Sequence, residues 1–584
     1  MSLTLLSIIV MVVLAGGYFL YGSFIARQFR LDDNTPTPAT TKNDGIDFVP
    51  ARPFYLLAQH FSAIAAAGPI AGPILACVAF GWLPCVLWIL IGVVFIGAVH
   101  DFSALVASIR HGAHSIAEIA RENLGKRAWL VLIVFIWLAL LYVIVAFTQI
   151  TAGSFVGKAE ELAGLNTTFN KGGAVAAAST LYLTLALVMG LVQRFLRPPM
   201  WLVTLIFVPA TLGCVYLGTQ LDSVLNFPAP AWYAIILAYC LVASMLPMWL
   251  LQQPRGYLGG FVLYIAIAVG LFGILFGGFT INQPAISDAA RASLNPAAAF
   301  RLFDSVNPIQ MTALVFPFLF VTIACGACSG FHGLICGGTT SKQVAKESHC
   351  RPVAFGAMLL EGLVAVIALA TVMILTPEQA GGAPPARIYG DGLALFLTKL
   401  IGSDAFLFCA TFGAMAFSTF VFDTLDVSTR LGRYLLQELF GTKGKLAGFL
   451  AAAATAGVPL VMLLSVDPAA YRLFWNLFGT SNQLLAALTL MGITVWLYRN
   501  DRRCWYTFAP MLFVLTITLW ALAIQIAVGI RDASNSAWRS PKGDLNPTIL
   551  NAAVAIALLA LAIVFVIESL RAVRAHRRPA LAIS

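Results

Sequence analysis

The chain has 584 residues, of which 60 % are hydrophobic and only 10 % are charged. A soluble protein carries about 25 % charged residues, so this composition excludes a soluble globular protein and predicts an all-α polytopic membrane protein in a lipid bilayer. The net charge of +10 is spread over short polar segments, with no soluble basic domain that would bind nucleic acid. We expect the basic residues to set membrane topology and to contact lipid headgroups.

About fifteen apolar segments are long enough to cross a bilayer as helices. The first has no basic residue before it and no clear cleavage site after it, so we expect a retained membrane helix rather than a signal peptide. In chain order the expected spans are residues 3–22, 54–80, 84–109, 128–152, 173–193, 199–218, 231–251, 257–279, 309–335, 352–376, 404–424, 446–464, 472–497, 505–529 and 548–570.

The distribution of Lys and Arg predicts the orientation of these spans. If the N-terminus lies outside and the spans alternate, 25 of the 35 Lys and Arg residues fall in cytoplasmic segments. Short cytoplasmic loops are enriched in basic residues, so we expect the N-terminus outside and the C-terminus in the cytoplasm. Between the tenth and eleventh spans, residues 390–396 are expected to form a short interfacial helix.

The second expected span is interrupted at its centre by two Gly-Pro pairs, Gly68-Pro69 and Gly72-Pro73. Proline removes a backbone donor and clashes with the preceding turn, and glycine lowers helix propensity, so residues 68–73 are expected to unwind the helix. Unpaired backbone groups are costly in hydrocarbon, and the break must therefore face protein, water or a ligand. One interpretation is a transporter binding site, and the other is a kink that only shapes helix packing.

The ninth expected span has a second break, over the small and polar residues 325–333. The two broken spans are seven apart in order, and because seven is odd they cross the bilayer in opposite directions. Paired broken helices in inverted halves are typical of a midplane transporter site, although both breaks can also be small-residue packing faces. We expect the substrate between them, with the binding residues His60, Gly68, Pro69, Gly72, Pro73, Cys325, Gly326, Ser329, Gly330 and His332.

Ionisable and hydroxyl side chains inside the spans are the candidates for ion coupling or gating. These are His100, Asp101, Glu361, Ser418, Thr419, Asp423, Asp426 and Arg430. The adjacent hydroxyls of Ser418 and Thr419, with carbonyls freed at a break, suit a sodium ion. Acidic and histidine side chains suit protons equally well.

Several of these residues also have a structural interpretation. His100 and Asp101 can hold helices together as a satisfied polar pair, and Glu361 can brace the ninth span. Asp426 and Arg430 are four residues apart on one helix, which is the spacing of an i,i+4 ion pair.

An intramembrane enzyme is the alternative in another class, and a channel is a third. Residues 479–482 contain part of an intramembrane serine protease pattern, but no histidine lies between His349 and His576. Cys325 and Cys328 have metal-ligand spacing, but structural zinc needs four ligands, so we expect no metal and no cofactor beyond a coupling ion. The other cysteines lie mostly in apolar runs and are expected to fill space. We therefore expect no enzyme activity.

Several long blocks of the sequence resemble the carbon starvation protein family, CstA. The blocks are residues 59–65, 68–73, 97–102, 316–326, 329–334, 338–340, 426–430 and 475–483. The resemblance covers nearly the whole chain. The chain is shorter than the longest members, and Cys328, Cys336 and Gly337 depart from the family pattern.

The resemblance implies a secondary transporter that imports short peptides or pyruvate-like small carboxylates across the cytoplasmic membrane of the cell. It also implies the amino acid–polyamine–cation superfamily, with a LeuT-like five-plus-five inverted repeat and accessory helices. On that mapping the chain divides into an N-terminal helix and connector (1–53), a first repeat (54–218), linking helices (219–308), a second repeat (309–498) and C-terminal accessory helices (499–584). The exact substrate, the coupling ion (proton or sodium) and the oligomeric state stay open.

Overall fold

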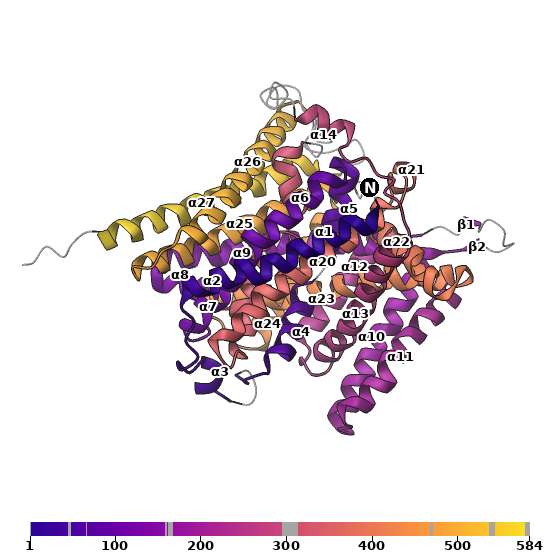
Figure 1. Ribbon diagram of the computed structural model, residues 1–584, viewed down its shortest axis with the longest axis horizontal. Coiled ribbons are helices and arrows are strands. Elements are labelled where there is room, and N and C mark those ends of the chain that lie inside the picture. The colour runs from indigo at the N-terminus through magenta and orange to yellow at the C-terminus, as the bar shows by residue number, and fades with distance from the viewer. Residues whose placement is uncertain are drawn as a thin grey trace, which may run out of the picture.

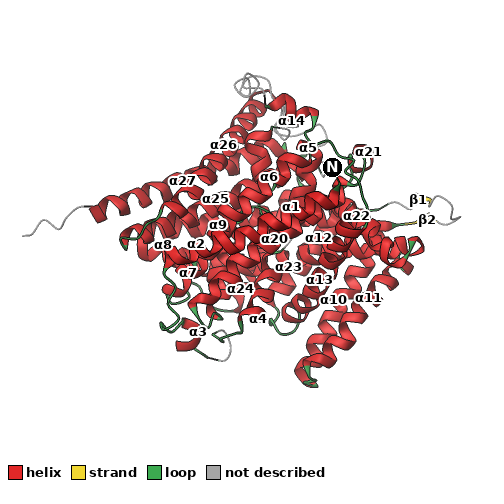
Figure 2. Ribbon diagram, viewed as in Figure 1, coloured by secondary structure: helices red, strands yellow, loops and turns green. Residues whose placement is uncertain are grey.

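The computed structural model describes residues 2–44, 48–65, 67–157, 160–161, 168–294, 314–467, 471–535 and 544–577. Nearly all of this chain is helical, as Figure 2 shows. The strands in these ranges form one antiparallel pair, β1 (Glu160–Glu161) and β2 (Thr168–Phe169), which projects from one edge of the helical body. The all-α membrane architecture expected from the composition is confirmed.

Twelve of the described helices are long and apolar enough to cross a membrane. The axes of helices α4 (Pro53–Ile64) and α5 (Gly68–Phe80) differ by 49° at the break between them. If the two helices together form one broken span, it is the thirteenth. The expected seventh span is the 17-residue helix α12 (Ala229–Met245). The expected ninth span is broken, and its first residues, 309–313, lie outside the described ranges.

The remaining elements follow in chain order. The long ones are α1 (Leu3–Gly16) with α2 (Ser23–Phe29), α6 (Trp82–Gly92) with α7 (Ala98–Arg110), α9 (Lys126–Phe155), α10 (Lys171–Phe195), α11 (Met200–Gln220), α13 (Gln252–Phe276), α20 (Ala357–Met373), α23 (Phe406–Phe440), α24 (Lys445–Leu464), α25 (Tyr471–Arg499), α26 (Trp505–Asn535) and α27 (Pro547–Arg577). The shorter ones are α3 (Pro38–Thr41), α8 (Ile116–Leu124), α14 (Asp288–Ser293), α18 (Phe320–Thr322), α19 (Gly330–Gly338), η6 (Arg351–Gly356), α21 (Pro377–Ala380) and α22 (Pro385–Ile401).

The centre of the bundle is built on α9, α20, α23 and α25. The most apolar 18-residue stretch of α25 is 100 % buried, whereas that of α11 is 28 % buried. In Figure 1, α25, α26 and α27 lie together on one side, and the α10–α11 pair projects on the other. A helix surrounded by protein can carry polar side chains that a lipid-facing helix cannot, so functional groups are expected on the central helices.

Residues 390–396 do not form a separate interfacial helix, so that expectation is wrong. They lie within α22, which packs against α23, α13 and α20. Tyr389 and Phe396 are buried, and a Cβ on Gly390 would lie 3.0 Å from Ala410 O of α23. The apolar residues of this segment therefore face the bundle instead of the headgroup region.

The connector that follows α2 is fastened to the segment before η6. Glu347 Oε2 accepts hydrogen bonds from the Asp32 amide of the connector and from Arg110 Nη2 of α7, each at 2.9 Å. The Asp33 carboxylate accepts hydrogen bonds from the Ser348 amide at 2.9 Å and from its hydroxyl at 2.7 Å. These two bonds hold the pKa of Asp33 below its ordinary value. The connector is therefore a packed part of this face of the protein.

Candidate functional site

The first break lies before the two Gly-Pro pairs and not within them. Helix α4 ends at Ile64 and α5 begins at Gly68, so Pro69 lies in the first turn of α5. The N–H groups of the first turn have no acceptor within a helix, so proline loses no helical hydrogen bond at that position. The fixed φ of proline also suits the start of a helix. The expectation that residues 68–73 unwind is therefore wrong, since they form the first turns of α5 with Pro73 inside the helix.

The second break separates α18 from α19. Cys325, Gly326 and Ser329 lie in the non-helical residues 323–329, whereas Gly330 and His332 lie in the first turn of α19. The break expected from the sequence is present, but it ends earlier than expected. His332 is consequently fixed by a helix.

Side chains from neighbouring helices satisfy backbone carbonyls at the second break. Trp475 Nε1 of α25 donates to Thr322 O at 3.1 Å, and Trp88 Nε1 of α6 donates to Ile323 O at 3.3 Å. A carbonyl freed in the membrane needs such a partner. These indoles supply a protein partner for the freed carbonyls of the break.

Asn482 of α25 caps the start of α19. Its Oδ1 accepts from the Phe331 amide at 3.0 Å. Its Nδ2 donates to Ser329 Oγ at 3.1 Å and to Cys325 Sγ at 3.2 Å. A side chain from another helix thus performs the role that an N-cap residue performs within its own helix.

The two breaks pack directly on each other. A Cβ on Gly68 would lie 2.4 Å from Cys325 Sγ, and a Cβ on Gly72 would lie 2.7 Å from Thr322 O. Real Cβ atoms do not approach so closely, so glycine is needed at both positions for this contact. The structure brings the predicted residues of the two breaks into contact.

A chain of buried ionisable groups joins α7, α19 and α20. Asp101 Oδ1 lies 2.7 Å from His100 Nδ1, and Asp101 Oδ2 lies 2.8 Å from His332 Nδ1. On its other side, His332 Nε2 lies 3.2 Å from Glu361 Oε2, which is an ion-pair distance. All four side chains are at most 1 % exposed. The predicted pair His100 and Asp101 is therefore part of one connected group with His332 and Glu361.

The geometry at His332 allows this group to hold a proton. A neutral imidazole has one N–H, but His332 faces a carboxylate at each ring nitrogen. Apart from His332 Nε2, no donor among the described residues bonds to the Glu361 carboxylate. A buried carboxylate without donors is expensive unless it is neutralised by a proton or by an imidazolium.

His60 lies next to this chain of groups and joins α4 to the end of α19. Its Nδ1 is 2.8 Å from Thr340 Oγ1, and its Nε2 is 4.0 Å from Cys336 Sγ. Cys336 in turn donates to Asp101 O at 3.5 Å. His60 therefore contacts the surroundings of Asp101 and does not line the contact between the two breaks.

A second buried cluster joins α12, α13 and α23. The Arg255 guanidinium pairs with Asp426 Oδ2 through Nη1 and with Asp423 Oδ1 through Nη2. Tyr239 OH donates to Asp426 Oδ2 at 2.9 Å. Arg255 is 1 % exposed, so it is not the cytoplasmic loop charge that the orientation count assumed.

The expected i,i+4 pair between Asp426 and Arg430 is wrong. Arg430 Nη2 donates to Ala243 O and to Leu246 O, each at 2.8 Å. The last carbonyls of a helix have no partner within it, and here the C-terminus of α12 takes the guanidinium of Arg430. Asp426 therefore pairs with Arg255 instead of Arg430.

The adjacent hydroxyls of Ser418 and Thr419 lie in different surroundings. Ser418 Oγ is 2.8 Å from Ser179 Oγ and donates to Met415 O at 2.9 Å. Thr419 Oγ1 is buried and makes no hydrogen bond to any described residue. The two hydroxyls therefore do not bond to a common partner among the described residues.

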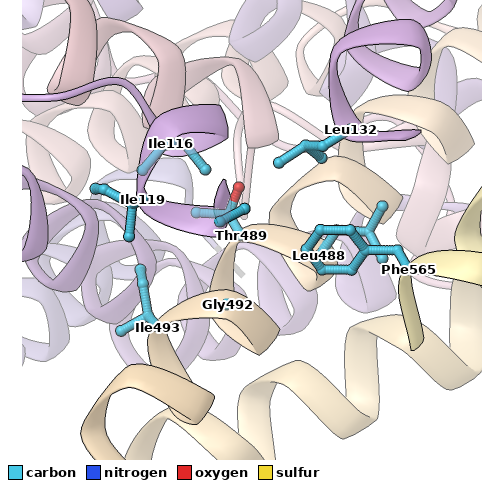
Figure 3. A pocket seen from close by; sticks show the side chains of 9 residues that line it. Ile116, Ile119, Leu132, Leu488, Thr489, Gly492, Ile493 and Phe565 are labelled. Carbon is cyan, nitrogen blue, oxygen red and sulfur yellow. The ribbon is translucent and has the colours of Figure 1, made fainter. Parts of the chain in front are cut away.

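A small cavity lies between α8, α9, α25 and α27 (Figure 3). Its volume is about 10 Å³, and its lining is apolar except for Thr489. A cavity of this size holds one water at most, and a water needs two to four polar partners, so this is a packing void. None of the residues predicted for the site lines it.

Metal-ligating side chains do not gather at the breaks. Among the residues that the structure describes, no group of three or more His, Cys, Asp or Glu side chains is arranged to hold a metal ion. Cys325 and Cys328 are buried free cysteines.

Comparison with known proteins shows the family. The sequence model described as "Carbon starvation protein CstA" matches residues 2–386 and 378–521. The chain belongs to the CstA family. It is 32 % identical to the peptide transporter CstA of Bacillus subtilis over 96 % of this chain and 95 % of the relative. It is 31 % identical to the pyruvate/proton symporter BtsT of Escherichia coli over 87 % of this chain and 80 % of the relative.

A further CstA relative is the peptide transporter CstA of Campylobacter jejuni, 33 % identical over 86 % of this chain and 77 % of its own. These relatives are named as transporters, which agrees with the expectation that the protein is not an enzyme. Among solved structures, a manganese transporter of Eremococcus coleocola matches with a TM-score of 0.44 and 12 % identity, over 88 % of this chain and 95 % of that one. MhsT in complex with L-phenylalanine matches with a TM-score of 0.42 and 14 % identity, over 88 % and 98 %.

The sequence analysis missed several residues that serve the site of this CstA protein. Trp88, Trp475 and Asn482 support the second break, and Arg255 organises the second cluster. Asn482 and Gln483 form an amide pair inside an apolar span, and intramembrane polar groups are a usable signal. Arg255 was missed because the apolar run visible in the sequence begins only after it, although α13 begins at Gln252.

Proposed function

We propose that this CstA-family protein is a secondary active transporter that imports short peptides or pyruvate-like small carboxylates in symport with protons. The names of the relatives, peptide transporter and pyruvate/proton symporter, support the substrate classes. The multi-span helical architecture supports transport across a membrane. On this proposal the protein lies in the cell membrane, with its N-terminus outside and its C-terminus in the cytoplasm.

The observation that carries the proton coupling is the position of His332 between Asp101 and Glu361. Gain or loss of a proton there changes the charge of a fully buried group by one. An uncompensated charge at the centre of a membrane helix costs about 3 kcal/mol, which is roughly a 100-fold change between two arrangements of the helices. One proton is thus sufficient to favour one helix arrangement over another.

The helix contacts support a five-plus-five inverted repeat. In this mapping α4–α5 corresponds to α18–α19, and α6–α7 corresponds to η6–α20. Helices α9, α10 and α11 correspond to α23, α24 and α25. A contact between the two repeats should then have a counterpart in which each helix is replaced by its equivalent. Helix α5 contacts α20, and α19 contacts α7. Likewise α10 contacts α23, and α24 contacts α9. Paired broken helices in such repeats hold substrate near the midplane, and relative motion of the repeats gives alternating access.

The test is uptake by the purified full-length protein in proteoliposomes. Radiolabelled pyruvate and the dipeptide dialanine are supplied under separate inward proton and sodium gradients. We expect accumulation driven by the proton gradient and abolished by a protonophore. His332→Gln and Glu361→Gln remove the titratable centre, and we expect each to lower proton-driven accumulation at least about tenfold, because a single lost charge interaction of about 1.4 kcal/mol already has that effect.

The matched control is His114→Gln, since the His114 side chain is 42 % exposed and lies outside the buried group. This variant is expected to transport like the wild type. Accumulation that follows only the sodium gradient, or undiminished proton-driven uptake by well-folded His332→Gln, would contradict the proposed coupling.

A further inference from the structure

We propose that Arg255 binds the carboxylate of the transported substrate, and that Asp423 is the group which the substrate displaces. The inference rests on the proposed function, because it names the side chain that recognises small carboxylates and the carboxyl termini of peptides. It is carried by the cluster of Arg255, Asp423, Asp426 and Tyr239.

A carboxylate needs a positive partner inside the membrane domain. Among the described residues, the buried side chains that carry a permanent positive charge are Arg255 and Arg430. Arg430 is committed to the two carbonyls at the end of α12. Arg255 is bound to carboxylates instead, and a guanidinium offers two N–H groups in a fork that matches a carboxylate.

The two carboxylates on Arg255 are not equivalent. Asp426 is 4 % exposed and is also held by Tyr239 OH at 2.9 Å. Asp423 is 28 % exposed, and Arg255 Nη2 is its hydrogen-bond donor in the described part of the chain. Asp423 is therefore the weaker ligand and the accessible one. A substrate carboxylate can replace it on Nη2 while Asp426 stays on Nη1.

The turn of α13 that follows Arg255 lies against Tyr182 of α10 and Thr419 of α23. A Cβ on Gly259 would lie 3.3 Å from Tyr182 OH and 3.5 Å from Thr419 Cγ2. Thr419 Oγ1 is buried and has no hydrogen-bond partner among the described residues, so it can donate to a bound substrate.

Another side of α13 contacts the helix that precedes the first break. A Cβ on Gly260 would lie 3.7 Å from Ser62 Oγ of α4, and α4 ends at Ile64. Gly260 is about 7.5 Å along the helix axis from Arg255 and about 140° around it, at about 1.5 Å and about 100° per residue. The first break therefore lies near the Arg255 cluster but on another side of α13.

Displacement of Asp423 links substrate binding to a proton. Once the substrate occupies Nη2, the Asp423 carboxylate has lost its counter-charge and is neutralised by a proton, so that one anion and one proton bind together. The other titratable groups around the cluster are Tyr239 and Cys240 of α12, Tyr182 of α10, Cys214 of α11 and Asp426 of α23 itself. Of these, only Asp426 is a carboxylate, and Arg255 and Tyr239 retain it.

The experiment measures direct binding of pyruvate and of dialanine to the purified full-length protein over a range of pH. For the wild type, affinity is expected to fall about tenfold per pH unit on the alkaline side, because binding takes up one proton. Asp423→Asn needs no proton, so its affinity is expected to be independent of pH. Loss of this slope is the result that supports the proposal, and a wild-type slope in Asp423→Asn overturns it.

A second variant removes the Arg255 cation together with the charge of Asp423, so that Asp423 is not left as an unpaired carboxylate. The neutral pair Arg255→Gln/Asp423→Asn is expected to bind pyruvate roughly tenfold more weakly or worse, and to lose the preference for pyruvate over methyl pyruvate, because the charge-assisted bond is gone. The control Lys171→Gln/Asp391→Asn removes an ion pair of 3.2 Å elsewhere and should keep both the slope and the preference. If the double variant at Arg255 keeps the preference, or if the wild type binds neither probe, the proposal is wrong.

The failures of this inference and of the proposed function are distinguishable. His332→Gln should lose proton-driven accumulation but keep the pH slope of binding, whereas Asp423→Asn should lose the slope. Absence of proton-driven uptake in the wild type would contradict the proposed function, and the slope of binding would still decide the role of Asp423.

Discussion

Replacement of Gly68 by alanine tests the contact between the two breaks. The new Cβ would lie 2.4 Å from Cys325 Sγ and 2.5 Å from Cys325 Cβ, so α5 and the second break must move apart. Overpacking of this kind costs about 1–3 kcal/mol. Where space is available, the same substitution in a helix instead gains about 0.5–1 kcal/mol. The sign of the effect therefore reports whether the contact exists.

A second substitution, Cys325→Gly, should relieve the clash in Gly68→Ala, because it removes both atoms that the new Cβ would contact. Cys325→Gly has a cost of its own, since Cys325 Sγ accepts from Asn482. A double-mutant cycle subtracts that cost and leaves the contact between positions 68 and 325. We expect a coupling of about 1–3 kcal/mol in favour of the double variant.

The assay is thermal unfolding of the purified full-length variants, followed by intrinsic tryptophan fluorescence. Gly68→Ala should unfold at a lower temperature than the wild type, and the double variant should unfold at a higher temperature than the sum of the single shifts gives. Gly492→Ala is the control, because a Cβ on Gly492 would meet no atom within 4 Å. Additive shifts, or a Gly68→Ala protein as stable as Gly492→Ala, would refute the contact.

Two further predictions concern hydrogen bonds that hold segments in place. Asn482→Ala leaves the Phe331 amide and Ser329 without their partner, and should lower the free energy of unfolding by about 1–3 kcal/mol. Asn500→Ala, at an exposed position just after α25, should have little effect. Equal thermal shifts of the two variants would contradict the cap. The pKa of Asp33 is lower in the folded protein than in the unfolded chain. Its contact with Ser348 therefore stabilises the docked connector fully above the unfolded pKa of about 3.9. This stabilisation is lost as the pH falls through the lower pKa of the folded protein. Asp33→Ala should therefore speed hydrogen exchange of the Ser348 amide at neutral pH, and an unchanged rate would show that this contact does not hold the connector.

The sequence predicts most membrane helices because each needs only a long apolar run. The positions of the breaks are predicted less well, since a proline in the first turn of a helix and a proline in its interior look alike in sequence. Pro69 lies in a first turn and is harmless there, so the chain unwinds before Gly68. The partners of the second break, Trp88 and Asn482, come from other helices, and no local pattern places them.

For the ionisable residues too, the sequence predicts which residues matter but not which of them contact one another. His100, Asp101, His332 and Glu361 are each visible as intramembrane ionisable groups, but their connection depends on how α7, α19 and α20 pack. Local spacing favoured Arg430 as the partner of Asp426. The carbonyls at the end of α12 compete for that guanidinium, and this competition exists only in the folded protein.

The two buried clusters share one arrangement, in which two carboxylates flank a central base. Asp101 and Glu361 flank His332, with His100 as a second imidazole on Asp101, and Asp423 and Asp426 flank Arg255. A buried carboxylate is costly unless a positive partner or a proton compensates its charge. In the first cluster the base is a histidine, which can itself release the proton, whereas an arginine cannot. The histidine cluster is therefore suited to hold and release a proton on its own, and the arginine cluster is suited to exchange one anion for another.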